Sequence, residues 1–146
     1  MNINRVDLIC AEGASLTVGD GSDIGRDSRF SANNRRGGIR VGKEVLFGPG
    51  VYLADSDHDY RDISVPIMKG GIYDYPEGSY LTIGDGSWLG KNVCVVGPVS
   101  IDKHCVVGAN SVVTRDIPDY TVVTGAPARV IRRWDPVKEM WIRASE

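Results

Sequence analysis

Apolar residues recur along this chain with a period of six, and this period restricts the possible folds more than any other feature. Stepping by six from residue 18, with two breaks, places an apolar residue first in each of twelve hexads. With 42% hydrophobic residues, chance would produce this in a fixed register about once in 30,000, and so short a period indicates a parallel β-helix. The twelve residues are Val18, Ile24, Phe30, Val41, Phe47, Leu53, Ile83, Leu89, Val95, Ile101, Val107 and Val113.

The other hexad positions indicate how the chain turns. The second position is Gly or Ala in eight of the twelve hexads, and the fifth is Ser, Val, Ile or Cys in ten. Glycine suits a corner where a side chain would crowd or where φ becomes positive. We therefore expect each hexad to form a short strand and a corner, and three hexads to close one coil. Stacked coils would then bury a continuous core.

Two segments depart from the repeat. Residues 59–82 contain no hexads, and a long loop inside a compact repeat is usually functional, although a tolerated surface insertion is the alternative. The tail at 134–146 is expected to cap the open end of the coils. A chain of 146 residues suits one core, so we expect a single domain over residues 1–146.

The repeat over residues 15–133 resembles that of the hexapeptide-repeat acyltransferases. The most specific segments are GDGSWLG, VVGANSVVTRDIP and GAPARVIRR, which resemble the CoA-binding half of this family. The chain is most similar to the sugar and polysaccharide O-acetyltransferases, including the maltose, galactoside and nodulation enzymes. The resemblance implies an all-β, left-handed parallel β-helix. It also implies acetyl-CoA as the donor, direct transfer to a sugar or glycan hydroxyl, and a homotrimer with active sites between subunits.

His58 ends a coil directly before the long loop, and it matches the catalytic position of the related sugar enzymes. A neutral imidazole can take the proton of a sugar hydroxyl while the oxygen attacks a thioester. Asp55, Asp57 and Asp59 surround His58, and one of them could orient the ring. Asp57 is preferred because it breaks the rule at the fifth position. The alternative is that all three are solvated loop acids.

Acceptor contacts are expected close to His58. The related enzymes place an asparagine in the preceding coil, which corresponds here to Asn33 or Asn34. The alternative is a corner asparagine that tolerates positive φ. Asp55 and Tyr60 are the other candidate substrate residues.

Backbone groups and arginines dominate the candidate donor site. Small residues leave backbone groups open to the amides of the pantetheine arm, and Gly108, Ala109 and Ser111 would supply them. Arginine suits the phosphates of CoA, which favours Arg129 and Arg132.

The resemblance adds three residues to the donor site. Lys91 and Thr114 match positions beside the pantetheine arm, and Trp88 matches a position that borders the acceptor and the thioester. Gly90 is a candidate backbone donor to the oxyanion that forms during transfer.

The sequence argues against some other functions and leaves others open. A γ-type carbonic anhydrase shares the fold but needs three zinc-binding histidines, whereas this chain has two, so no metal is expected. A net charge of -2 does not suggest a nucleic acid partner, and no apolar run could span a membrane. Without a signal peptide at its start, the chain is expected to be cytoplasmic. An N-acetyltransferase for a nucleotide-linked amino sugar, an antibiotic acetyltransferase and a non-catalytic scaffold remain alternatives.

Overall fold

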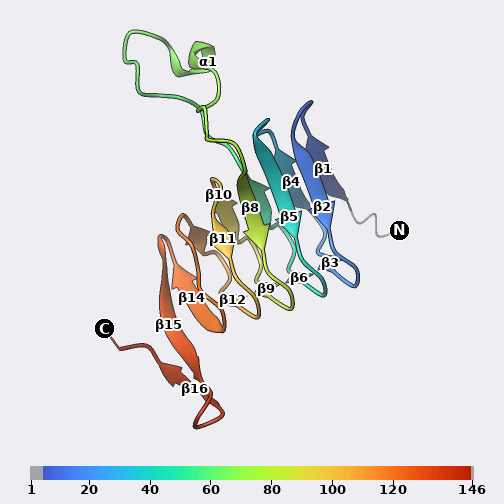
Figure 1. The fold of residues 1–146 in the computed structure, drawn as a ribbon, viewed down its shortest axis with the longest axis vertical. Coiled ribbons are helices and arrows are strands. Elements are labelled where there is room, and N and C mark those ends of the chain that lie inside the picture. The colour runs from blue at the N-terminus through green and yellow to red at the C-terminus, as the bar shows by residue number, and fades with distance from the viewer. Residues whose placement is uncertain (1–4, 146) are drawn as a thin grey trace.

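The computed structural model describes residues 5–145 and shows an all-β chain built from three sheets, parallel throughout the coils (Figure 1). The first sheet contains β1 (Val6–Cys10), β4 (Ser28–Ala32), β7 (Tyr52–Ala54), β10 (Cys94–Val96) and β13 (Val112–Val113). The second contains β2 (Ser15–Val18), β5 (Gly37–Val41), β8 (Ser79–Ile83) and β11 (Ser100–Ile101). The third contains β3 (Asp23–Ile24), β6 (Leu46–Phe47), β9 (Trp88–Leu89), β12 (Val106–Val107), β14 (Thr121–Gly125), β15 (Ala128–Asp135) and β16 (Met140–Arg143).

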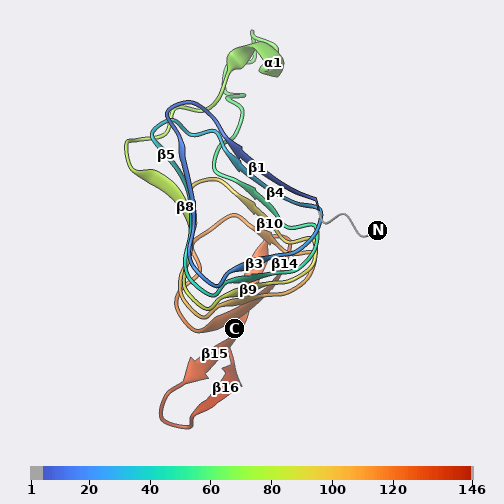
Figure 2. The same ribbon diagram turned by 90° about the vertical axis from the view of Figure 1, so that its right-hand side faces the viewer.

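The chain visits the three sheets in turn and so winds into a triangular coil (Figure 2). In the regular part of the repeat, each residue pairs with the one eighteen positions away, as Val106 pairs with Trp88. The predicted parallel β-helix is therefore confirmed. We name the corners by the direction of the chain: the first edge joins the first sheet to the second, the second edge joins the second to the third, and the third edge joins the third back to the first.

The interior is filled by the first residues of the hexads. Ten of the twelve are at most 4% exposed, from Phe30 through Val113. The Phe30 and Phe47 rings lie one above the other, with centroids 4.9 Å apart. Val18 and Ile24 are more exposed because they belong to the first coil, which has a neighbour on one side only.

Glycines at the second and fourth hexad positions have different roles. At the second position, a Cβ on Gly84 would lie 2.5 Å from backbone atoms of Asp102 and Lys103 in the next coil, so no side chain fits. Gly86, at the fourth position, has a φ of +69°, and a Cβ there would make only an ordinary contact with His104 Nδ1 at 3.6 Å. Positive φ also occurs in residues other than glycine at this fourth position: Asp27, Glu44, Asn92, His104 and Asn110.

Serines at the fifth position connect one coil to the next. The Ser87 hydroxyl donates to the carbonyl of Asp102 at 3.0 Å and accepts from the amide of Cys105 at 3.0 Å. Ser22 and Ser28 make equivalent pairs of bonds with the coil that follows them. Because a buried amide without a partner costs about 1–3 kcal/mol, these hydroxyls stabilise the stacking.

The inserted loop is shorter than the sequence predicts. The predicted range of 59–82 is wrong at its end, because β8 begins at Ser79 and pairs residue by residue with β5. Leu81 lies opposite Ile39 and is completely buried. The excursion that ends at Gly78 leaves the coil at the first edge and carries the short helix α1 (Ile67–Gly70), as Figure 1 shows.

The tail forms a hairpin that lengthens one sheet. β15 runs antiparallel to β14, and β16 runs antiparallel to β15, so the third sheet continues beyond the coils. The Trp134 and Trp141 rings meet edge to face across the hairpin, 5.7 Å between centroids. The expected cap therefore covers the outer edge of the third sheet, while the hairpin projects from the coil (Figure 2). Within residues 5–145, no helix has the length and apolar character needed to cross a membrane.

Candidate active site

His58 lies in a cavity of about 410 Å³ at the first edge. Three successive coils contribute to its walls, because Asn33 follows β4, Ala54 ends β7 and Val96 ends β10. The full lining is Asn33, Tyr52, Ala54, Ser56, Asp57, His58, Ile72 and Val96. The His58 side chain is exposed, so a solvent-borne acceptor can reach it.

The end of the insertion returns alongside His58 and closes the cavity. His58 pairs with Ile72 as an antiparallel bridge. Two backbone bonds flank this bridge, from Asp59 N to Gly71 O at 2.9 Å and from Tyr73 N to Asp57 O at 2.8 Å. The sequence indicated the histidine, but no repeat or motif indicated that Ile72 would lie opposite it.

Asp57 has a different partner from the one predicted. Its Oδ2 accepts a hydrogen bond from the Tyr75 hydroxyl at 3.1 Å, and among residues 5–145 it has no hydrogen bond with His58. Burial and the adjacent Asp57 carboxylate raise the pKa of Tyr75 to about 12, so this hydroxyl keeps its proton and donates. The expectation that Asp57 holds the His58 ring directly is therefore corrected.

The other two acids near His58 also have hydrogen-bond partners other than the imidazole. Asp59 accepts two side-chain hydrogen bonds from Arg61, at 2.8 and 2.5 Å, and these bonds lower its pKa to about 2. Asp55 is completely buried. Its carboxylate accepts from the backbone amides of Asn33, at 2.8 Å, and Asn34, at 3.2 Å. Burial raises the pKa of Asp55 in spite of these bonds.

The predicted acceptor residues therefore separate into different roles. Asn33 lines the cavity and is partly exposed. The expectation that Asp55 contacts the acceptor is wrong, because its buried carboxylate shapes the turn that carries Asn33. Asn34 is buried and donates to the carbonyl of Ser79 at 2.8 Å, which ties this turn to the second sheet. Tyr60 lies on the insertion, 71% exposed, and outside the cavity lining.

A second cavity of about 410 Å³ adjoins the first. The two share Asn33 and Ile72, and the second is also lined by Asn34, Arg35, Arg36, Tyr73 and Asp74. The hexad pattern did not indicate these arginines as cavity residues. Their only signal was their position directly after the two asparagines in the run NNRR.

Several predicted donor residues gather at the third edge. Gly90, Lys91, Gly108 and Ala109 follow β9 and β12, and their segments stack because these strands pair. A Cβ on Gly108 would lie 2.7 Å from the side chain of Thr124 in the last coil. Thr124 pairs in turn with Arg129, so that arginine belongs to the same corner. Lys91, Ala109 and Arg129 are exposed there.

Other donor predictions are corrected by the structure. The amide of Gly90 donates to the carbonyl of Val107 at 2.9 Å, so it is not open to an oxyanion. Ser111 is completely buried, and its hydroxyl accepts from the amide of Gly125 at 3.1 Å. Thr114 directly follows β13 and so lies at the first edge, apart from Ala109.

Two further donor candidates lie on the third sheet. Trp88 in β9 is half exposed. Arg132 pairs with Val122 and Arg143 in the middle of the projecting hairpin. In one chain, then, His58 lies at the first edge and the main donor group at the third, with the first sheet between them.

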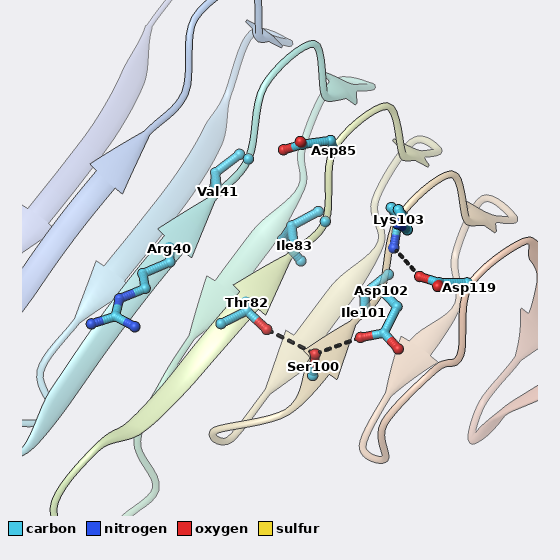
Figure 3. Close-up of a pocket in the computed structure, with 12 residues that line it drawn as sticks. Arg40, Val41, Thr82, Ile83, Asp85, Ser100, Ile101, Asp102, Lys103 and Asp119 are labelled. Atoms are coloured by element: carbon cyan, nitrogen blue, oxygen red, sulfur yellow. Dashed lines mark hydrogen bonds between the residues drawn. The ribbon is translucent and has the colours of Figure 1, made fainter.

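A third hollow, of about 400 Å³, lies over the second sheet and the second edge (Figure 3). None of the predicted site residues lines it. Three of its polar side chains bond to one another: Thr82 Oγ1 donates to Ser100 Oγ, and Ser100 Oγ donates to Asp102, both at 2.9 Å. In the part of the chain that the structure describes, no group of three His, Cys, Asp or Glu side chains is placed to hold a metal.

Comparison with known proteins agrees with this architecture. Residues 81–115 match the family profile described as bacterial transferase hexapeptide (six repeats). A Mycobacterium tuberculosis protein named as a probable acetyltransferase is 36% identical over 132 residues, which is 90% of this chain and 42% of that protein. This chain spans about half the length of the curated relatives it matches.

Solved structures extend the likeness to the fold. A maltose O-acetyltransferase from Clostridium difficile is 30% identical with a TM-score of 0.70, covering 88% of this chain and 66% of that one. A hexapeptide-repeat acetyltransferase from Vibrio cholerae, solved with acetyl coenzyme A, is 27% identical with a TM-score of 0.68, covering 86% and 64%. With its repeat, its three sheets and these relatives, the chain belongs to the bacterial hexapeptide-repeat transferase family.

Proposed function

We propose that this protein transfers an acetyl group from acetyl-CoA to a hydroxyl of a sugar or glycan. The observation that carries the proposal is the cavity at the first edge, where His58 and Asn33 face one space closed by the returning insertion. The relatives named as a maltose O-acetyltransferase and an acetyl-CoA complex support the choice of acceptor and donor.

His58 would act as the general base. Acetyl-CoA supplies a thioester, whose carbon to sulfur bond breaks as the acceptor oxygen bonds to the acetyl carbon. The neutral imidazole removes the hydroxyl proton during attack and can return it to the leaving thiolate, so atoms and charges balance without an acyl-enzyme. Asn33, at the cavity wall, would hydrogen bond the acceptor through its Oδ1 and orient it, while its Nδ2 donates to Ser31 Oγ at 2.8 Å.

The third edge suits the donor. Ala109, which follows Gly108 at this corner, is small and exposed, and Asn110 beside it is exposed too. An extended arm with amide groups can lie along such a corner. Arg129 is exposed at the same corner and suits the phosphates of CoA.

A complete site would then need a second copy of the chain. His58 and the donor group occupy different edges of one prism. We therefore propose a homotrimer of left-handed coils, each one domain, in which the first edge of one subunit faces the third edge of the next.

Thiol release from acetyl-CoA tests the function. We expect His58→Ala to lower turnover by about 10² to 10⁴, the usual contribution of a general base, and to leave acetyl-CoA affinity nearly unchanged. His104→Ala is the matched control, because His104 lies at the second edge against Tyr120 and outside the cavity. If His58→Ala and His104→Ala turn over equally fast, His58 is not the base. If no sugar or glycan releases thiol, the function itself is wrong.

A further inference from the structure

The second cavity has a net positive charge that has no role in the proposed acetyl transfer. Arg35 and Arg36 line it together with one acid, Asp74. Arg36 contacts Asp74, at 3.4 Å, and donates to the carbonyl of Tyr75 at 3.4 Å. Within the described residues, no carboxylate lies within ion-pair distance of Arg35. The lining therefore keeps one uncompensated positive charge.

The three acids around His58 have partners other than Arg35. Asp55 is buried against the amides of Asn33 and Asn34, and Asp59 is held by Arg61. Asp57 accepts from Tyr75 and lines the His58 cavity. Glu12 adjoins Gly13, where a Cβ would lie 3.5 Å from Cβ of Arg35, but within the described residues it forms no ion pair with Arg35. An anion that enters from solvent would therefore meet Arg35 without breaking an ion pair.

The two cavities together have opposite character at their ends. The end at His58 contains Asp57, and the end at Arg35 contains the unpaired guanidinium. Asn33 and Ile72 belong to both cavities, so one ligand can extend from one end to the other. A guanidinium binds carboxylate or phosphate oxygens through paired hydrogen bonds, while Asp57 would repel the same group.

From this arrangement we infer that the acceptor is an anionic sugar, with its carboxylate or phosphate at Arg35 and its reacting hydroxyl at His58. The inference rests on the proposed acetyl transfer and adds the substrate class and its orientation. Arg35 is a binding residue in this scheme and takes no part in proton transfer. Since its side chain is exposed and is not part of the core, it can be replaced without loss of the fold.

The test compares acceptors that differ in charge alone. Glucuronate and galacturonate are assayed beside their neutral amides, and glucose 6-phosphate beside glucose, by thiol release from acetyl-CoA. We expect kcat/KM to be about 10-fold to 100-fold higher for an anionic member, which is the range of a hydrogen-bonded charge. Its KM should rise with salt because a partly exposed charge pair is screened.

Variants assign the preference to Arg35. Arg35→Gln should abolish the advantage of the anion and leave turnover of the neutral member within about two-fold, since one ion pair is removed. Arg35→Glu should favour the neutral member. Lys43→Gln is the control, because it removes one exposed positive charge at the second edge. Equal rates for charged and neutral members, or a preference that survives in Arg35→Gln, would overturn the inference.

A binding experiment separates this inference from the proposed function. Saturation-transfer NMR with glucuronate and glucuronamide should show contact with the acid in the wild type and its loss in Arg35→Gln. Absence of thiol release with every acceptor, together with this binding, would contradict acetyl transfer but support the anion site. Release with neutral sugars and no selective binding of the acid would contradict the anion site alone.

Discussion

Three aspartates lie within three residues of His58, and each has a different environment. Asp55 is buried and accepts from backbone amides, Asp57 accepts from a tyrosine hydroxyl, and Asp59 is paired with Arg61. The same residue type therefore has a raised pKa at Asp55 and a lowered one at Asp59. Tyr75, eighteen residues from Asp57, is the residue that links the insertion to the histidine segment through a side chain.

The Asp59 carboxyl should titrate with a pKa of about 2, compared with its ordinary value of 3.8, because Arg61 donates to it. The lowered pKa means that the pair favours the folded insertion above pH 3.8 and loses this effect as pH falls through about 2. In Arg61→Gln, the pKa of Asp59 should rise toward 3.8. Carboxyl chemical shifts followed by NMR against pH measure it.

Asp62 provides the internal control for that titration. Its pKa is lowered by hydrogen bonds from Ser64, so Arg61→Gln should leave it low. An Asp59 that titrates near 3.8 in the wild-type protein would show that the Arg61 contact is not formed in solution.

Within each element of the coil, the positions of the hexad have different structural roles. The first fills the interior, the second lets neighbouring coils approach, the fourth turns the chain at positive φ, and a serine at the fifth bonds to the next coil. The second and fourth positions both use glycine, but for different reasons. Asparagine already occupies the fourth position at Asn92 and Asn110, whereas the second has no room for a Cβ at Gly84.

Gly84→Ala and Gly86→Asn should therefore differ in stability although they lie in the same corner. The alanine Cβ would meet backbone of the next coil, and overpacking of this kind costs about 1–3 kcal/mol. The asparagine has a tolerated φ, and its Cβ would meet His104 Nδ1 only at an ordinary contact distance of 3.6 Å, so a change within about 1 kcal/mol is expected. Urea unfolding at equal protein concentration compares the two free energies. A larger loss for Gly86→Asn would contradict these assigned roles.

For the whole molecule, the positions of the first and third edges decide whether one chain can form a complete active site. The first sheet separates the His58 edge from the donor edge, and both edges run along the outside of the prism (Figure 2). An acceptor at His58 and a thioester at Ala109 would be brought together by a neighbouring subunit. The unit of function expected from this geometry is an assembly with one site at each contact between chains.

Mixing two inactive variants tests whether the site is shared. His58→Ala lacks the base, and Ala109→Trp would block the donor corner, where Ala109 is exposed. In the proposed trimer, random mixing should recover about a quarter of the wild-type sites, because one subunit can supply His58 and its neighbour the open corner. Thiol release before and after unfolding and refolding the mixture measures the recovery. No recovery in verified mixed trimers would mean that each site belongs to one chain.

The sequence by itself determined the coil, its three sheets, the core residues and the position of His58 before the insertion. These features are periodic or local: each hexad repeats the same burial pattern, and pairing with the next coil follows from the period. The same regularity explains why the predicted end of the insertion was wrong, since Ser79–Thr82 joins the second sheet by pairing with β5 before the next hexad begins.

Only the tertiary structure decided which side chains surround His58. Tyr75 reaches Asp57 and Ile72 faces His58 because the insertion closes on itself, and loop closure has no period that a sequence reveals. In the structure, Asp55 and Ser111 are also buried. Arg35 has no acidic partner among residues 5–145. Those outcomes depend on distant chain segments competing for the same hydrogen bonds, which three-dimensional packing alone resolves.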